Sequence, residues 1–136
     1  MYQVYNKTST EYAQNAPIVF NTTKFTDCRV TNTSGTTFSI RAPGRYLVSF
    51  NGVGSSTQAT SPFTVALYQN EVALPETTTT VYSTAANDVG ALAFSTIVNV
   101  LPSCASVNNR VNLQVVATSA NSGTMTNANL VIYRLK

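Results

Sequence analysis

The residues of this chain that could do acid–base or nucleophilic chemistry are few. Among its 136 residues there is no His, so neither a Ser-His-Asp nor a Cys-His arrangement can form. A pair of carboxylates could still cleave a glycosidic bond, because spacing along the chain does not fix spacing in the fold. The five carboxylates, each of which also fits an ordinary solvated turn, are Glu11, Asp27, Glu71, Glu76 and Asp88. We therefore predict that the protein is not an enzyme and has no catalytic residues.

Oxygen ligands for a calcium ion occur at two points in the sequence. Asp88 lies beside Asn87, and Glu76 is followed by Thr residues whose hydroxyls and carbonyls could bind a hard cation. Neither point has the dense Asp and Asn pattern of a dedicated calcium loop. The sequence therefore predicts no metal site and no cofactor.

The two cysteines, Cys28 and Cys104, lie far apart in the chain. A disulfide between them would close a long loop, would stabilise the fold by about 4 to 5 kcal/mol on the chain-entropy treatment, and would imply an oxidising location. Two small buried thiols are the alternative. Their separation fits no zinc motif, so these two interpretations remain.

The charge pattern argues against a nucleic-acid partner. The net charge of +3 arises from eight basic residues that are scattered along the chain and form no Lys/Arg stripe. The N-terminal residues lack the basic and apolar regions of a secretory signal, and no apolar run has transmembrane length. We expect neither nucleic-acid binding nor membrane insertion.

The polar residues are mostly Thr, Asn and Ser, which favour strands and turns over helices. Short apolar segments alternate with turn clusters, at residues 16–21, 25–30, 38–41, 46–50, 63–69, 89–100, 111–115 and 130–135. This spacing predicts an all-β protein, an antiparallel sandwich of two sheets of jelly-roll type with roughly ten strands. We expect residues 1–15 to be an N-terminal arm or attachment segment and residues 16–136 to be the jelly-roll domain.

Two of these segments, 63–69 and 130–135, are apolar on both faces, whereas a monomeric sandwich usually alternates apolar inside with polar outside. The residues on the second faces, with one from segment 111–116, are Ala66, Tyr68, Val116, Val131, Tyr133 and Leu135. If the strands are neighbours in one sheet, its outer face needs a cover, and self-association is the simplest one. Loops or the N-terminal segment folding over that face are the alternative.

One stretch resembles a known family. Residues 38–50, FSIRAPGRYLVSF, are similar to the Phe-x-x-x-x-x-Gly-x-Tyr-x-Val/Phe-x-Phe signature of the trimeric jelly rolls of the tumour necrosis factor and complement component 1q superfamily, which has bacterial and phage members. In that signature Gly44 turns the chain between two strands and the aromatic residues enter the core. The segments 65–70, 89–100, 109–113 and 130–132 follow in the family's order, so the resemblance covers most of the chain.

The chain departs from the family at two turns. Glu71 stands where the family has Gly. A type I′ turn there would cost about 1 kcal/mol, so we expect a different turn. Asn108 and Asn109 replace a Gly-Asp pair, which removes a carboxylate.

The resemblance implies a homotrimer whose inner sheet, built from the first, last and middle strands, lines the threefold axis. We assign the segments that contain Phe63, Val111 and Leu130 to that sheet. The candidate trimer interface is then formed by Ala66, Tyr68, Gln114, Val116, Val131, Tyr133 and Leu135.

Two functions are consistent with the sequence. The first is a non-catalytic structural or adhesive module, a homotrimeric head on a virion, spore or cell surface. It would bind a surface glycan or protein through loops such as 52–61 and 117–127. The second is a monomeric carbohydrate-binding module in which Tyr68, Tyr82 or Tyr133 stacks on sugar rings. The absence of Trp, which offers the largest stacking face, weighs mildly against the second.

Overall fold

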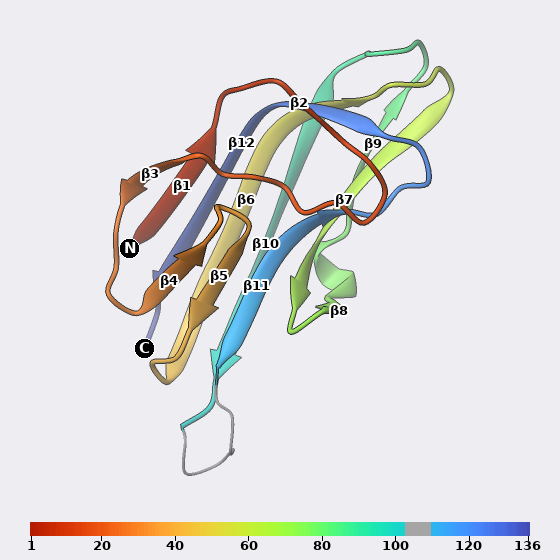
Figure 1. Cartoon of the computed structure of the whole chain (residues 1–136). Helices are drawn as coiled ribbons and strands as arrows, with labels where there is room; N and C mark the ends of the chain where they lie inside the picture. The colour runs from red at the N-terminus through yellow and green to blue at the C-terminus, as the bar shows by residue number, and fades with distance from the viewer. Residues whose placement is uncertain (103–109) are drawn as a thin grey trace.

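The computed structural model describes residues 1–102 and 110–136, and nearly all of its regular structure is β-strand (Figure 1). Twelve strands and one short 3-10 helix occur in this part of the chain. They are β1 (Tyr2–Asn6), β2 (Thr10–Tyr12), β3 (Thr22–Phe25), β4 (Val30–Thr33), β5 (Thr37–Ile40), β6 (Gly44–Ser56), β7 (Ser61–Gln69), β8 (Val72–Ala73), η1 (Pro75–Thr77), β9 (Thr79–Ser83), β10 (Gly90–Val100), β11 (Val111–Ala117) and β12 (Gly123–Arg134). The predicted all-β class is confirmed, with two strands more than the ten expected.

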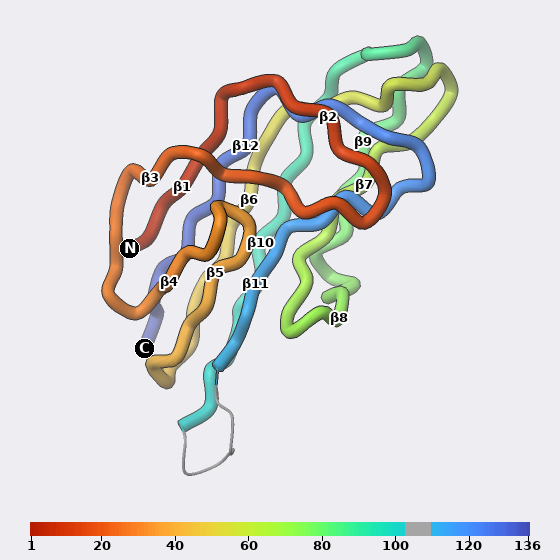
Figure 2. The backbone as a smooth tube through the Cα atoms, viewed as in Figure 1, coloured from red at the N-terminus to blue at the C-terminus, as the bar shows by residue number. Residues whose placement is uncertain are grey.

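The strands form two six-stranded antiparallel sheets. Sheet A has the order β10-β6-β12-β1-β3, and β2 also pairs with β12. Sheet B has the order β4-β5-β11-β7-β8, and β9 also pairs with β7. The chain crosses from β5 to β6 and from β6 to β7, and again from β10 to β11 and from β11 to β12, each time changing sheet (Figure 2). This connectivity confirms the predicted jelly-roll sandwich.

Period-two alternation places one face of each long strand in the core. Tyr46, Val48 and Phe50 of β6 are buried, as their spacing predicts. Phe20 meets Phe50 edge to face, and Phe50 stacks on Phe94 with 5.2 Å between ring centroids. Such aromatic pairs add about 0.5 to 1.5 kcal/mol each beyond the burial of their area.

Gly44 begins β6 in a backbone conformation that a side chain would oppose. Its φ is +147°, and a Cβ there would lie 2.5 Å from the carbonyl oxygen of Lys136. The Arg45 N–H donates to the Lys136 carbonyl, and the Arg45 carbonyl accepts from the Leu135 N–H. The signature glycine therefore allows the C-terminal segment to lie against the start of β6.

The predicted grouping of three segments in one sheet is wrong. Phe63 on β7 and Val111 on β11 belong to sheet B, whereas Leu130 on β12 belongs to sheet A. A strand with an apolar second face needs another element or molecule to cover that face. The pattern does not identify the strand's neighbours in the sheet, because long-range pairing decides them.

Residues 1–15 are part of the sandwich and not an arm. β1 pairs with both β12 and β3, and β2 pairs with β12. Tyr2, Val4 and Tyr12 are buried in the core. Their alternation is too short, and too much interrupted by polar residues, to have indicated a strand in the sequence.

Two predicted loops and one predicted turn also differ from the structure. β6 continues through residues 52–56 and β12 begins at Gly123, because Gly52 and Gly54 let the two strands approach closely. Asn70 and Glu71 both have positive φ, 51° and 70°, as in a type I′ turn. Asn70 is held by two hydrogen bonds to the backbone of Asn112, which offset the strain.

Candidate functional site on the exposed face of sheet A

The face of sheet A that points away from the core carries an exposed apolar region. Ile97 pairs with Leu47, and Leu47 pairs with Tyr133, so the three side chains form one row across the sheet. The exposed fractions of Ile97, Tyr133 and Leu135 are 58%, 46% and 47%. We call this region the apolar half; it consists of Leu47, Ile97, Val131, Tyr133 and Leu135. A contiguous patch of this kind indicates a surface that another molecule covers.

Two rows further along the same strands the face becomes polar. Asn51 pairs with Asn129, and Asn129 pairs with Tyr5. Around this row lies a depression of about 430 Å³ that we call the amide hollow. Its lining consists of Gln3, Tyr5, Lys7, Lys24, Asn51, Asn127 and Asn129.

The amide hollow contains cations and no carboxylate. Lys7 Nζ lies 6.0 Å from the centre of the Tyr5 ring, and Lys24 Nζ lies 5.4 Å from that of Phe25. All five carboxylates of the chain belong to the described residues, and neither ammonium forms an ion pair with any of them. The hollow is therefore a local positive site in a weakly charged protein.

The side-chain amides of the hollow are only partly used. Gln3 Nε2 donates to Asn129 Oδ1 at 2.9 Å, which fixes these two amides relative to each other. Within the described part of the chain, the side chains of Asn51 and Asn127 form no hydrogen bond. Each free amide offers one acceptor and two donors to a ligand.

The candidate interface residues do not lie together. Val131, Tyr133 and Leu135 belong to the apolar half of sheet A, but the other four lie on the outer face of sheet B. There Tyr68 pairs with Gln114 and Ala66 pairs with Val116. Ala66 and Val116 are buried, and Pro17 of the N-terminal segment forms a bridge with Val116, as in the alternative covering we considered.

The carboxylates are dispersed and serve local structure. Three of them accept hydroxyl hydrogen bonds: Ser122 Oγ to Glu11 Oε1 at 2.9 Å, Thr96 Oγ1 to Glu76 Oε2 at 3.1 Å and Thr84 Oγ1 to Asp88 Oδ2 at 3.0 Å. In residues 1–102 and 110–136, no three His, Cys, Asp or Glu side chains gather where they could hold a metal ion. The expectation of no metal site and no cofactor at the two points considered above stays a prediction.

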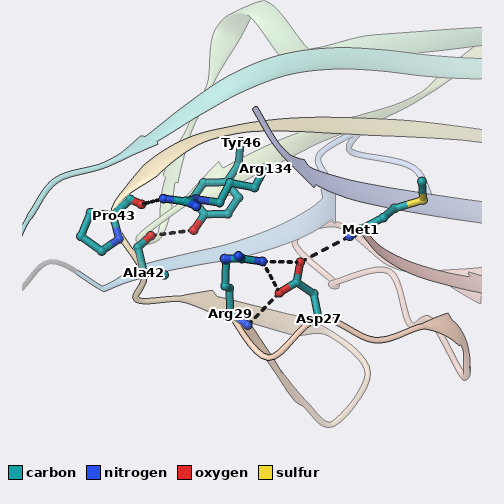
Figure 3. A network of polar contacts seen from close by, with 7 residues as sticks. All are labelled: Met1, Asp27, Arg29, Ala42, Pro43, Tyr46 and Arg134. Carbon is teal, nitrogen blue, oxygen red and sulfur yellow. Dashed lines mark hydrogen bonds and ion pairs between the residues drawn. The ribbon is translucent and has the colours of Figure 1, made fainter. Parts of the chain in front are cut away.

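Asp27 is the centre of a small polar network near the start of β1 (Figure 3). Its Oδ1 accepts from Arg29 N at 3.0 Å and from Arg29 Nη1 at 3.1 Å, and its Oδ2 lies 3.4 Å from the Met1 ammonium. The backbone hydrogen bond from Arg29, more than the two positive charges, lowers the pKa of the Asp27 carboxyl. This network fastens the N-terminus to the segment between β3 and β4.

Beside it, two further hydrogen bonds close the turn before β6. Tyr46 Oη donates to the Ala42 carbonyl at 2.7 Å, and Arg134 Nη2 donates to the Pro43 carbonyl at 2.9 Å (Figure 3). Arg134 belongs to β12, so this turn is tied to the strand that carries Tyr133. These two hydrogen bonds therefore fix the turn between β5 and β6.

The predicted disulfide is not tested. Cys28 is exposed, which does not fit the buried thiol of the alternative interpretation. Cys104 lies outside the described residues, so a bridge between the two stays a prediction.

In the part of the chain that the structure describes, no helix is long and apolar enough to cross a membrane.

Leu47, Ile97 and the asparagines of the hollow were not predicted from the sequence as site residues. In β6 and β10 only the core-facing residues were predicted, although the same alternation puts Leu47 and Ile97 on the opposite face. Asn127 fell in a predicted loop. A search for apolar residues on the outward positions of strands would have found the first two.

No protein-family model and no curated protein matches the sequence. Solved structures do match the fold. The globular domain of zebrafish complement 1qA has 11% identity and a TM-score of 0.72, over 99% of this chain and 96% of that one. Eiger TNF from S. frugiperda has 11% identity and a TM-score of 0.71, over 99% and 93%. The PRD1 vertex protein P5 has 14% identity and a TM-score of 0.55, over 99% and 96%. The chain therefore has the jelly-roll fold of the complement component 1q and tumour necrosis factor domains, as its signature segment predicts.

Proposed function

We propose that the protein is a non-catalytic structural and adhesive module that assembles as a homotrimer and binds a surface glycan or protein. The observation that carries the assembly is the apolar half of sheet A, where Ile97, Tyr133 and Leu135 stay about half exposed in the single chain. Sheet A is built from the first, last and middle strands, which are those that the family resemblance assigns to the threefold axis.

The energetic argument is the removal of apolar area from water. Burial stabilises by about 25 cal/mol per Å² of apolar surface, and large side chains in one patch are covered together. Tyr133 suits an interface because its ring can be buried while its hydroxyl keeps a polar partner. The proposed interface consists of Val131, Tyr133 and Leu135 from the predicted set, together with Leu47 and Ile97. It does not include the predicted residues of sheet B.

Light scattering on the purified chain tests the assembly. We expect a mass of three times 14.6 kDa. Ile97→Asp should dissociate the trimer, because the carboxylate would be buried without a partner. Val72→Asp is the matched control, since Val72 is 66% exposed on β8 of sheet B. A monomeric parent chain at micromolar concentration, or equal masses for the two variants, would rule out this interface.

The location outside a cell, on a virion or on a cell or spore surface, belongs to the same proposal. Its support is the fold shared with complement 1qA, TNF and a vertex protein. Immunogold labelling of the source particle or cell with an antibody against the chain tests it. Label confined to the interior would contradict it.

A monomeric carbohydrate-binding module is the second candidate, because Tyr82 is 60% exposed and could stack on a sugar ring. Tyr133→Ala separates the two functions. Loss of oligomeric mass supports the trimer, whereas loss of glycan binding at unchanged mass supports the monomeric module.

A further inference from the structure

We infer that the amide hollow of sheet A is a binding site for an acidic saccharide, a sugar that carries a carboxylate. The inference rests on the binding function proposed above, but it does not need the trimer, because a single chain supplies the whole lining. It also moves recognition from the loops to the polar half of a sheet face.

The hollow has the size of a small-ligand site. A depression of about 430 Å³ lies within the range of small-ligand sites, roughly 300 to 1,000 Å³. Strands β1, β3, β6 and β12 supply all the lining residues except Lys7, which directly follows β1, so backbone ladders hold most of the site in place. A site of this size admits one or two sugar rings.

The polar groups of the hollow match those of a sugar. The amides of Asn51 and Asn127 are unused within the described residues, and an amide can donate to one hydroxyl while accepting from the next. Vicinal hydroxyls of a sugar present this alternation of donor and acceptor. Tyr5 adds an aromatic ring, whose negative face attracts the C–H bonds of a pyranose.

The charge of the hollow favours an anionic ligand. Lys7 and Lys24 bring two ammonium groups that no carboxylate of the chain neutralises. A charge-assisted hydrogen bond to a ligand carboxylate is about twice as strong as a neutral one. Two localised cations suit a single carboxylate, whereas a polyphosphate chain needs a longer basic stripe.

The same chemistry explains why this half of the face stays open. Burying an unpaired amide is unfavourable, and burying two ammonium groups without a counter-charge is more so. When copies of the chain are in contact through the apolar half, the hollow should therefore either stay in water or face a negatively charged group. A saccharide carboxylate supplies that charge.

Calorimetric titration of the full chain with sialyllactose, with lactose and with trigalacturonate tests the site. We expect both acidic saccharides to bind, lactose to bind at least tenfold more weakly, and the acidic affinity to fall as NaCl is raised. The variant Lys7→Gln/Lys24→Gln should lose about tenfold or more of the acidic affinity. The matched control is Arg45→Gln/Lys136→Gln, which removes two charges outside the hollow and should bind as the parent does.

Several results would overturn the inference. They are no binding by either acidic saccharide, equal binding of lactose, unchanged affinity in Lys7→Gln/Lys24→Gln, or tripolyphosphate that binds more tightly than both saccharides. The oligomeric mass is measured on the same samples. A trimer that binds no saccharide removes this inference and leaves the proposed assembly standing, whereas a monomer that binds acidic saccharide does the reverse.

Discussion

The two halves of the exposed face of sheet A lie on the same strands but differ in chemistry. β6 and β12 give Leu47 and Tyr133 to the apolar half, and Asn51 and Asn129 to the amide hollow. The apolar half gains free energy when water leaves it, whereas the hollow loses free energy unless each polar group finds a partner. A single sheet can therefore carry an assembly surface and a recognition surface side by side, and the two meet where Gln3 of the hollow pairs with Val131 of the apolar half.

The largest expected effect comes from a change beneath the border between the two halves. Phe50 is buried on the core side of β6, between Ser49 and Asn51, and stacks on Phe94. Phe50→Ala should reduce the free energy of unfolding by about 3 to 5 kcal/mol and weaken both halves together. Urea unfolding measures the loss. Ser49→Ala is the surface control, and a loss below about 1 kcal/mol in Phe50→Ala would contradict the packing.

A change at Gly52 should separate the halves. A Cβ at this position would lie 2.5 Å from the carbonyl oxygen of Asn127, which lies in the amide hollow. Gly52→Ala should cost about 1 to 3 kcal/mol of stability and displace Asn127, so that acidic-saccharide binding weakens. The oligomeric mass should not change. A lower mass with intact saccharide binding would show that the halves are not independent.

Moving the border itself is the third test. Asn129→Leu should extend the apolar half, abolish saccharide binding and slow dissociation of the trimer. The lost hydrogen bond from Gln3 should cost about 1 kcal/mol of stability. Calorimetry and light scattering on dilution measure the two outcomes. Asn129→Asp is the control: it keeps the hydrogen bond from Gln3, and its negative charge should weaken only the binding of acidic saccharides. If the trimer of Asn129→Leu dissociated faster than that of the parent, the border between the two halves would not lie at Asn129.

The smallest expected effect is the pH dependence from Asp27, whose network lies outside the amide hollow. Its pKa is lowered in the folded state, so its contribution to stability is present above the unfolded value and is lost as pH falls through the folded value. Asp27→Asn should therefore be less stable than the parent at pH 7, and the difference should shrink on acidification below about pH 4. Thermal unfolding across that range measures it. A difference that grows toward acid would have the wrong sign.

The sequence predicted those parts of the fold in which local pattern is strong. The alternation of Tyr46, Val48 and Phe50 located a core-facing strand, and the segment around Gly44 predicted the jelly-roll fold. The prediction failed where the pattern is short or interrupted. Tyr2 and Val4 are too few to distinguish a strand from an arm, and Gly52 signals a loop although the strand continues through it.

The candidate site was only partly predictable. Val131, Tyr133 and Leu135 were identified because a strand that is apolar on both faces is unusual in a sandwich. Ala66, Tyr68 and Val116 were grouped with them by the same reasoning, yet they lie on the opposite sheet. The amide hollow gave no signal, because its residues come from four separate strands and the residue after β1, and each is an ordinary polar residue by itself.

The amino-acid sequence by itself determined the class of the protein: composition excluded His-based catalysis, and period-two alternation required strands with a buried face. Only the tertiary structure decided which strands are neighbours, and hence that Leu47, Ile97 and Tyr133 share one row while Asn51, Asn129 and Tyr5 share another. The physical reason is that side-chain direction follows from local backbone geometry, whereas strand order and register depend on hydrogen bonds between segments far apart in the chain.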